Sequence, residues 1–217
     1  MTTIQGFLAI WSDIPKLHET NYLHWFTREH AAERVGLPGF IRVRFFRARL
    51  PEVRRYFILY DLQSSNAIAS ESYLERLNDP TQWSRQIMPL LENFTRGGGR
   101  RIARRGLGDG AVVAPLSFGT HGDAPSDVML HDLSALDRIA SATYFEVDQR
   151  VSAVPSYEKS LRTEDRSFDG LLLVEALDDP ALDTALDELR KRVSITGPIA
   201  RYEHVFALDR ANLKAAV

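Results

Sequence analysis

The sequence predicts an α+β protein made of two tandem ferredoxin-like (βαββαβ) units, with antiparallel sheets packed face to face. Three observations support this prediction. Strand and helix patterns follow the order β-α-β-β-α-β in residues 1–106, and the same order returns in residues 112–217. The segment between them, 106–111, is rich in glycine, as expected of a boundary between two units.

The elements of the first unit follow from residue periodicity. Residues 4–11 are an apolar run that ends at a Ser-Asp-Ile-Pro turn, which is typical of a buried strand. Residues 22–35 carry aromatic and apolar side chains three and four positions apart, and therefore predict a helix that stops at the glycines and proline of 36–39. The remaining patterns predict strands 40–48 and 55–62, helices 67–77 and 83–93, and a strand 100–105 that begins after the glycine triplet 97–99.

The second unit repeats this order. A Ser-Asp pair opens its first helix, and apolar runs bounded by polar residues mark its strands. The predicted elements are strands 112–118, 143–148, 171–176 and 201–208 and helices 126–140 and 181–193.

Composition excludes several classes of protein. The chain has 217 residues and no cysteine, so it has no disulfides, thiolate metal ligands or thiol nucleophile. No apolar run approaches the roughly 20 residues of a membrane span. The N-terminal residues lack the basic region of a signal peptide, so we expect a cytoplasmic protein without a membrane partner.

Charge is divided unevenly between the halves. Residues 1–110 carry 16 basic and 11 acidic side chains, and residues 111–217 carry 11 and 18, giving +5 and −7. A nucleic-acid surface normally produces a strongly basic domain, whereas the pI of this chain is about 6.3. We therefore expect no nucleic-acid partner, and interpret the alternating arginines of 42–49 as one face of a strand.

One segment of the first half resembles a known family. The sequence WFTREHAAER at 25–34, then LPGF at 37–40 and Arg44, is similar to the W-Y-x-x-E-H-x-x-E-R…P-G-F…R pattern of the EthD-like branch of the dimeric α+β barrel superfamily. Residues 56–62, 81–84 and 93–94 also resemble that branch. The likeness covers about residues 4–105, with Phe26 in place of the usual tyrosine, and the second half lacks the motif.

The resemblance implies a barrel with a pocket between sheet and helices. The superfamily contains cofactor-free isomerases, cyclases and decarboxylases, oxygen-using enzymes and haem enzymes, and many members act on aromatic, ring-cleavage or polyketide-derived molecules. Because fold does not fix function, the residues must supply the argument for the chemistry.

His30 is the first catalytic candidate, because imidazole exchanges protons near neutral pH and this residue lies near the end of the first helix. The alternative is that His30 only caps or packs, with a hydrogen bond to the Pro38-Gly39 turn. Arg42 and Arg44 share a strand face with Phe40 and Phe46, and could bind a substrate carboxylate through the guanidinium fork. A structural ion pair with Glu29, Glu33 or Asp61 is the alternative for these arginines.

Further candidates are aromatic or lie in loops. Trp25 and Trp83 could line an aromatic pocket, and the Tyr60 hydroxyl could donate to an oxyanion, although all three could also be core. His121 follows a strand in a loop and is the second acid–base candidate. His18, His24 and His30 are spaced six apart and cannot share one helix face, so we predict no metal site.

Two functions remain open from the sequence. One is a cofactor-free hydrolase, isomerase or lyase acting on a small carboxylated aromatic-derived or ring-cleavage compound. The other is a non-catalytic small-molecule-binding or stress-response barrel. The sequence has no nucleotide-binding glycine motif, so we predict no cofactor, with haem as a third and weaker option. Whether the chain forms a homodimer stays open.

Overall fold

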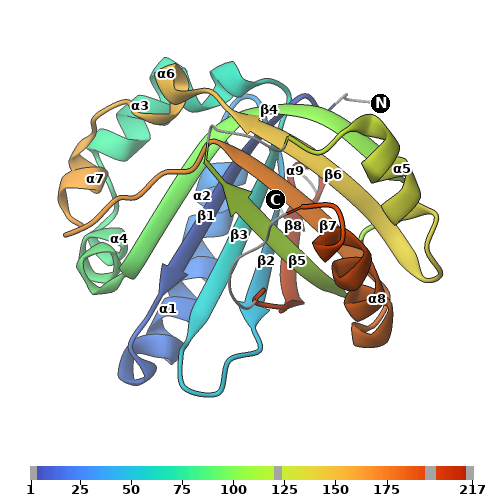
Figure 1. Ribbon diagram of the computed structural model, residues 1–217. Helices are drawn as coiled ribbons and strands as arrows, with labels where there is room; N and C mark the ends of the chain where they lie inside the picture. The colour runs from blue at the N-terminus through green and yellow to red at the C-terminus, as the bar shows by residue number, and fades with distance from the viewer. Residues whose placement is uncertain (1–3, 120–123, 194–198, 214–217) are drawn as a thin grey trace.

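The chain folds into a closed antiparallel barrel in the computed structural model, which describes residues 4–119, 124–193 and 199–213. Eight strands follow one another around the barrel in the order β1-β3-β2-β8-β5-β7-β6-β4 (Figure 1). They are β1 (Gly6–Asp13), β2 (Phe40–Ala48), β3 (Arg55–Leu62), β4 (Glu92–Gly106), β5 (Val112–Phe118), β6 (Ile139–Val147), β7 (Gly170–Ala176) and β8 (Tyr202–Asp209). The predicted α+β class is confirmed.

Each half of the chain contributes four neighbouring strands. The first half supplies β4-β1-β3-β2 and the second half β8-β5-β7-β6, so both halves place their strands in the same relative order. The barrel closes where β2 pairs with β8 and β4 pairs with β6. The two halves are therefore joined edge to edge along two seams.

The helices cover the outside of the barrel. They are α1 (Glu19–Trp25), α2 (Ala31–Val35), α3 (Glu71–Asn78), α4 (Gln82–Ile87), α5 (Asp127–Ser134), α6 (Gln149–Ser152), α7 (Tyr157–Ser160), α8 (Asp179–Arg190) and α9 (Arg210–Leu213). A π-helical turn, Phe26–His30, joins α1 to α2. In Figure 1, α5 and α8 lie on one side of the barrel, and α3, α6 and α7 lie on the other. Within the described ranges, no helix is long and apolar enough to cross a membrane.

Alternation along each strand divides the apolar side chains between two sides of the sheet. In β1, Phe7 belongs to the cluster inside the barrel, while its neighbour Leu8 belongs to the cluster under the first-half helices. The cluster under α5 and α8 is separate from both. The barrel interior and the two helix-covered faces are therefore three distinct cores.

Several predicted boundaries were wrong. The glycine triplet does not precede the last strand of the first half, because β4 begins at Glu92 and continues through 97–99. The predicted helix 83–93 is shorter for the same reason, and the helix predicted over 126–140 ends at Ser134. The sequence patterns also missed α6 and α7, which are only four residues long.

Close packing explains why glycine occupies this strand. A Cβ atom at Gly99 would lie far inside van der Waals contact of the Glu146 backbone oxygen, at the seam between β4 and β6. A Cβ at Gly98 would overlap the Ile68 side chain. Glycine within a strand often marks such a close approach, so the triplet belongs to the sheet and does not interrupt it.

We expect Gly99→Ala to lower the free energy of unfolding by about 3 kcal/mol, because the added methyl group forces the β4–β6 seam apart. Gly108→Ala is the matched control, since a Cβ there meets nothing within 4 Å. Urea denaturation of both variants measures the difference. Equal stability of the two variants would show that the seam accommodates the methyl group.

Candidate functional site

The helix that contains the predicted histidine places two functional groups on one face. His30 ends the π-helical turn, and Arg34 follows four residues later in α2. Residues four apart on a helix lie one above the other. Both side chains point toward the first-half sheet and are 5% and 3% exposed. Sequence and local geometry therefore bring an imidazole and a guanidinium to the same buried position.

The imidazole of His30 is held by aromatic packing. Its ring centroid lies 4.2 Å from that of Trp25, and Nδ1 lies 3.7 Å from the Glu33 carboxylate, beyond hydrogen-bond distance. Nδ1 has no hydrogen-bond partner among the described residues. Burial, followed by the charges of Arg34 and Arg162, lowers the pKa of His30 well below 6.5. The imidazole is therefore neutral at physiological pH and can accept a proton.

A tyrosine hydroxyl faces the same cavity. Tyr60 projects from β3 and lines the cavity with His30, yet its hydroxyl makes no hydrogen bond within the described structure. Burial is the main cause that raises the pKa of Tyr60 well above 10. The hydroxyl thus stays protonated and is available as a hydrogen-bond donor.

The cavity, called the His30 cavity below, is small and carries positive charge. Its volume is about 20 Å³, space for about one water molecule. Four basic side chains and one acidic side chain line it: Arg34, Arg96, Lys159, Arg162 and Glu158. The guanidinium of Arg34 forms a buried ion pair with Glu158, and the Arg162 guanidinium lies 4.0 Å from the centre of the Phe94 ring. An excess of buried positive charge favours an anionic ligand.

Arg42 and Arg44 do not line this cavity, so the structure does not bring the two predicted substrate-binding arginines beside His30. Arg44 lies inside the barrel, where Nη1 is 2.7 Å from Glu175, and Arg42 pairs with Asp61 and Asp109. Tyr60 points to the opposite face of the sheet, into the helix-covered cluster. Arg42 instead forms an ion pair with Asp61, which was the alternative interpretation of this arginine.

A β-bulge in β2 explains why strand alternation predicted one common face for residues that lie on opposite sides of the sheet. The pairing of β2 with β3 shifts register between Phe40 and Arg42, so strict alternation fails at this point. Phe40 consequently packs under the helices, whereas Phe46 lies inside the barrel. The four residues 40, 42, 44 and 46 do not share one face, as the alternation had predicted.

The other predicted residues occupy different positions. Trp25 is buried against His30 and donates from Nε1 to Ser84 Oγ at 3.1 Å, so it supports the His30 ring without lining the cavity itself. Trp83 is half-buried on α4 and donates to Asn21 at 3.0 Å, away from the cavity lining. His121 lies outside the described residues.

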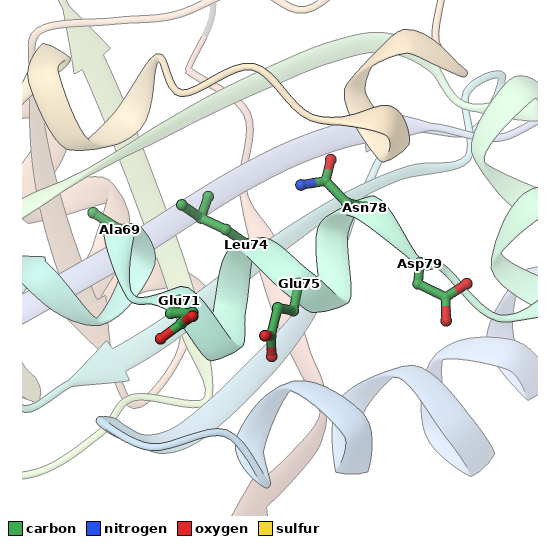
Figure 2. Close-up of a pocket in the computed structure, with 6 residues that line it drawn as sticks. All are labelled: Ala69, Glu71, Leu74, Glu75, Asn78 and Asp79. Atoms are coloured by element: carbon green, nitrogen blue, oxygen red, sulfur yellow. The ribbon is translucent and has the colours of Figure 1, made fainter.

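A second concavity on α3 is an open groove, with no convergent functional groups. Figure 2 shows the carboxylates of Glu71, Glu75 and Asp79 pointing away from Leu74 and Asn78. These carboxylates belong to exposed residues. Across the described ranges, no three His, Asp or Glu side chains are placed to bind a metal ion.

Sequence reasoning missed the residues that complete the His30 cavity. Arg34 belongs to the family-like motif and lies one helical repeat from His30, and this spacing was a usable signal. Glu158 and Arg162 lie more than 120 residues away from the helix, between β6 and β7, where no pattern predicted an element. Only the folded topology brings them to the first half.

Comparison with known proteins finds solved structures of similar architecture, and these identify the fold alone. No protein-family model and no curated protein matches the sequence. An anthrone oxidase-like protein superposes with a TM-score of 0.61 at 7% identity, covering 96% of this chain and 94% of the other. A "putative monooxygenase" from Fusobacterium nucleatum gives 0.57 at 9% identity, with 96% of each chain covered.

A "putative chlorite dismutase" gives a TM-score of 0.54 at 12% identity, covering 99% of this chain and all of the other. Identities this low carry information on architecture alone. The matches extend over nearly the whole chain. The chain therefore shares the fold of these proteins, an antiparallel eight-stranded α+β barrel that is closed here within one polypeptide.

Proposed function

We propose that this protein is a cofactor-free enzyme that moves a proton on a small carboxylated substrate, of the aromatic-derived or ring-cleavage type, bound in the His30 cavity. One observation carries the proposal: the imidazole of His30 and the hydroxyl of Tyr60 are buried, unpartnered in the described structure and directed to the same cavity. Unsatisfied buried polar groups are costly, and such groups concentrate at functional sites.

The three groups have complementary roles. The neutral His30 imidazole accepts a proton from the substrate, and Tyr60 donates a hydrogen bond to the oxygen on which negative charge develops. Arg34 binds the substrate carboxylate, the role predicted for Arg42 and Arg44. Its second terminal nitrogen, Nη1, is free of a hydrogen-bond partner in the described structure.

Proton removal is common to several reaction classes. Hydrolysis, isomerisation and lyase chemistry all use it, and so does oxidation of an electron-rich, deprotonated substrate by O₂. The likeness to an anthrone oxidase-like protein and to a "putative monooxygenase" supports the oxygen-using class. Haem does not fit the residues present, because the His30 ring is buried and packed against Trp25.

We also infer that the chain is a tandem of two ferredoxin-like units, 1–106 and 112–217, with an EthD-like first unit. The identical relative order of the strands in the two halves supports this. The second half contributes three buried charged side chains among the described residues, Glu158, Arg162 and Glu175. None lies under α5 and α8, so the proposed site is single and belongs to the first unit.

The test is proton exchange followed by oxygen uptake. A panel of small aromatic carboxylates and phenols is incubated with the protein in D₂O, and deuterium incorporation is followed by NMR beside an oxygen electrode. Tyr60→Phe should reduce the rate about 10²-fold, the usual effect of removing one oxyanion donor. Tyr157→Phe, at an exposed position on α7, should keep the wild-type rate. Binding without exchange or uptake would indicate a receptor instead.

A further inference from the structure

The connection between β6 and β7 crosses to the other half of the chain. Residues 148–169, called the crossing segment below, contain α6 and α7. In Figure 1 these short helices lie near α3, far from α5 and α8. The backbone N–H of Tyr157 donates to Asn78 Oδ1 at the end of α3, at 3.0 Å. A segment of the second half therefore covers the cavity of the first half.

The crossing segment places a carboxylate against the most buried arginine of the cavity. Glu158 in α7 is 6% exposed and reaches Arg34 Nη2 with one oxygen. Arg34 Nη1 receives no partner in the described structure. The pair thus uses a single contact, although guanidinium and carboxylate bind best through two parallel hydrogen bonds. A carboxylate presented from inside the cavity can improve on this geometry.

We propose that Glu158 occupies the site of the substrate carboxylate, and that the crossing segment is a lid which a carboxylate ligand displaces. This inference rests on the proposed function. The closed cavity is too small for an aromatic ring, so the substrate can enter only if the crossing segment moves. Displacing Glu158 removes one negative charge from Arg34, and the incoming carboxylate replaces it.

The lid is held mainly by polar contacts. Arg96 Nη1 donates to the Ser152 backbone oxygen at 2.8 Å, and the Gly98 N–H donates to Ser152 Oγ at 3.2 Å. Within the segment, Lys159 Nζ donates to the same backbone oxygen. Val151 and Leu161 supply apolar packing and are only partly buried. Phe168, at the end of the segment, is buried in the barrel cluster, so the part that moves is residues 149–162. Polar contacts can be exchanged for contacts with water, so the loss of these hydrogen bonds on opening is partly compensated.

The basic side chains around Glu158 favour the exchange for another anion. Arg34, Arg96, Lys159 and Arg162 line the cavity with Glu158, and Arg162 also pairs with Asp165 at 3.0 Å. Desolvation and the charge of Arg96 lower the pKa of Lys159 to about 8. Four basic side chains thus face two carboxylates, Glu158 and Asp165, which neutralise the positive field of the cavity only in part.

The experiment compares benzoate with benzamide, a neutral molecule of similar shape, on Glu158→Ala. Benzoate should raise the melting temperature of this variant, with a half-saturating concentration at least tenfold lower than for the wild type, because the internal competitor is gone. For benzamide, the half-saturating concentration should be the same in Glu158→Ala and in the wild type. Glu164→Ala is the control, since Glu164 lies on the same segment in an exposed pair with Arg166, and it should behave as the wild type.

Two results would overturn the inference: equal benzoate affinity in Glu158→Ala and wild type, or an equal gain for benzoate and benzamide. If Glu158→Ala does not fold, hydrogen exchange of the wild-type protein decides. Saturating benzoate should accelerate amide exchange in residues 149–162, while slower or unchanged exchange contradicts a displaced lid. Neither assay requires turnover, so an absent enzymatic activity would refute the proposed function without affecting this result.

Discussion

Replacing Arg34 by methionine should lower the free energy of unfolding by about 3 to 5 kcal/mol. The variant leaves the Glu158 carboxylate buried without its partner, and removing one member of a buried ion pair typically costs this much. The contact of the Arg34 guanidinium with Tyr73, at 5.8 Å from the ring centre, is lost as well. Because Glu158 comes from the other half of the chain, the loss also weakens the attachment of the crossing segment.

A double variant separates the ion pair from general packing. Arg34→Met with Glu158→Leu should recover most of the stability, because a buried ion pair replaced by apolar side chains of similar volume is often neutral. Arg166→Met, which breaks an exposed pair with Glu164, should change stability by less than about 1 kcal/mol. Chemical denaturation measures the free energy of unfolding of Arg34→Met, the double variant and Arg166→Met. The values are compared where the dependence on denaturant concentration has the same slope. A double variant as unstable as Arg34→Met would show that the charge pairing is not the cause.

The uneven charge of the sequence has a structural explanation. Arginines of the first half pair with carboxylates of the second half, as in Arg44 with Glu175 and Arg47 with Glu203. The excess of basic residues before position 110 and of acidic residues after it therefore supplies ion pairs that hold the two halves of the chain together. Composition could argue against a nucleic-acid surface, but the pairing partners depend on which strand edges meet, and this is a property of the closed barrel.

The strand and helix order could be predicted because each element has its own period. The structure at positions where two elements meet could not be predicted in this way. The glycine triplet has the composition of a turn, yet its meaning depends on Ile68 and Glu146, which approach from elsewhere in the fold. The register shift near Phe40 is likewise set by pairing between strands.

The candidate site was predictable in its local part only. His30, Trp25 and Tyr60 follow from a helix face and a strand face of the first half, and they gather around the same cavity or its wall. Glu158 is carried by a four-residue helix in a long connection, which has no periodic signal. Arg42 and Arg44 attracted attention as arginines on a strand, but strand alternation alone does not reveal which face looks into the barrel.

Replacing His30 by glutamine should lower the proposed turnover by two to four orders of magnitude, the usual contribution of general acid–base catalysis. Glutamine keeps a polar, similarly sized side chain beside Trp25 but cannot accept a proton at neutral pH. The loss should appear in kcat and in kcat/KM equally if His30 acts only in the transition state. His131→Gln, at an exposed position on α5, controls for the loss of a histidine.

The pH profile of the wild type provides an independent check on this assignment. Catalysis requires the neutral imidazole, and the environment of His30 lowers its pKa well below 6.5. In the wild type kcat/KM should therefore stay constant as the pH falls from 7 to 6.5, a range in which Lys159 is already protonated, and decline only in more acidic buffer, where the imidazole becomes protonated. That decline should be missing from the residual activity of His30→Gln. A folded His30→Gln protein, verified by circular dichroism, with wild-type turnover would exclude His30 as the base and make His121 the next residue to replace.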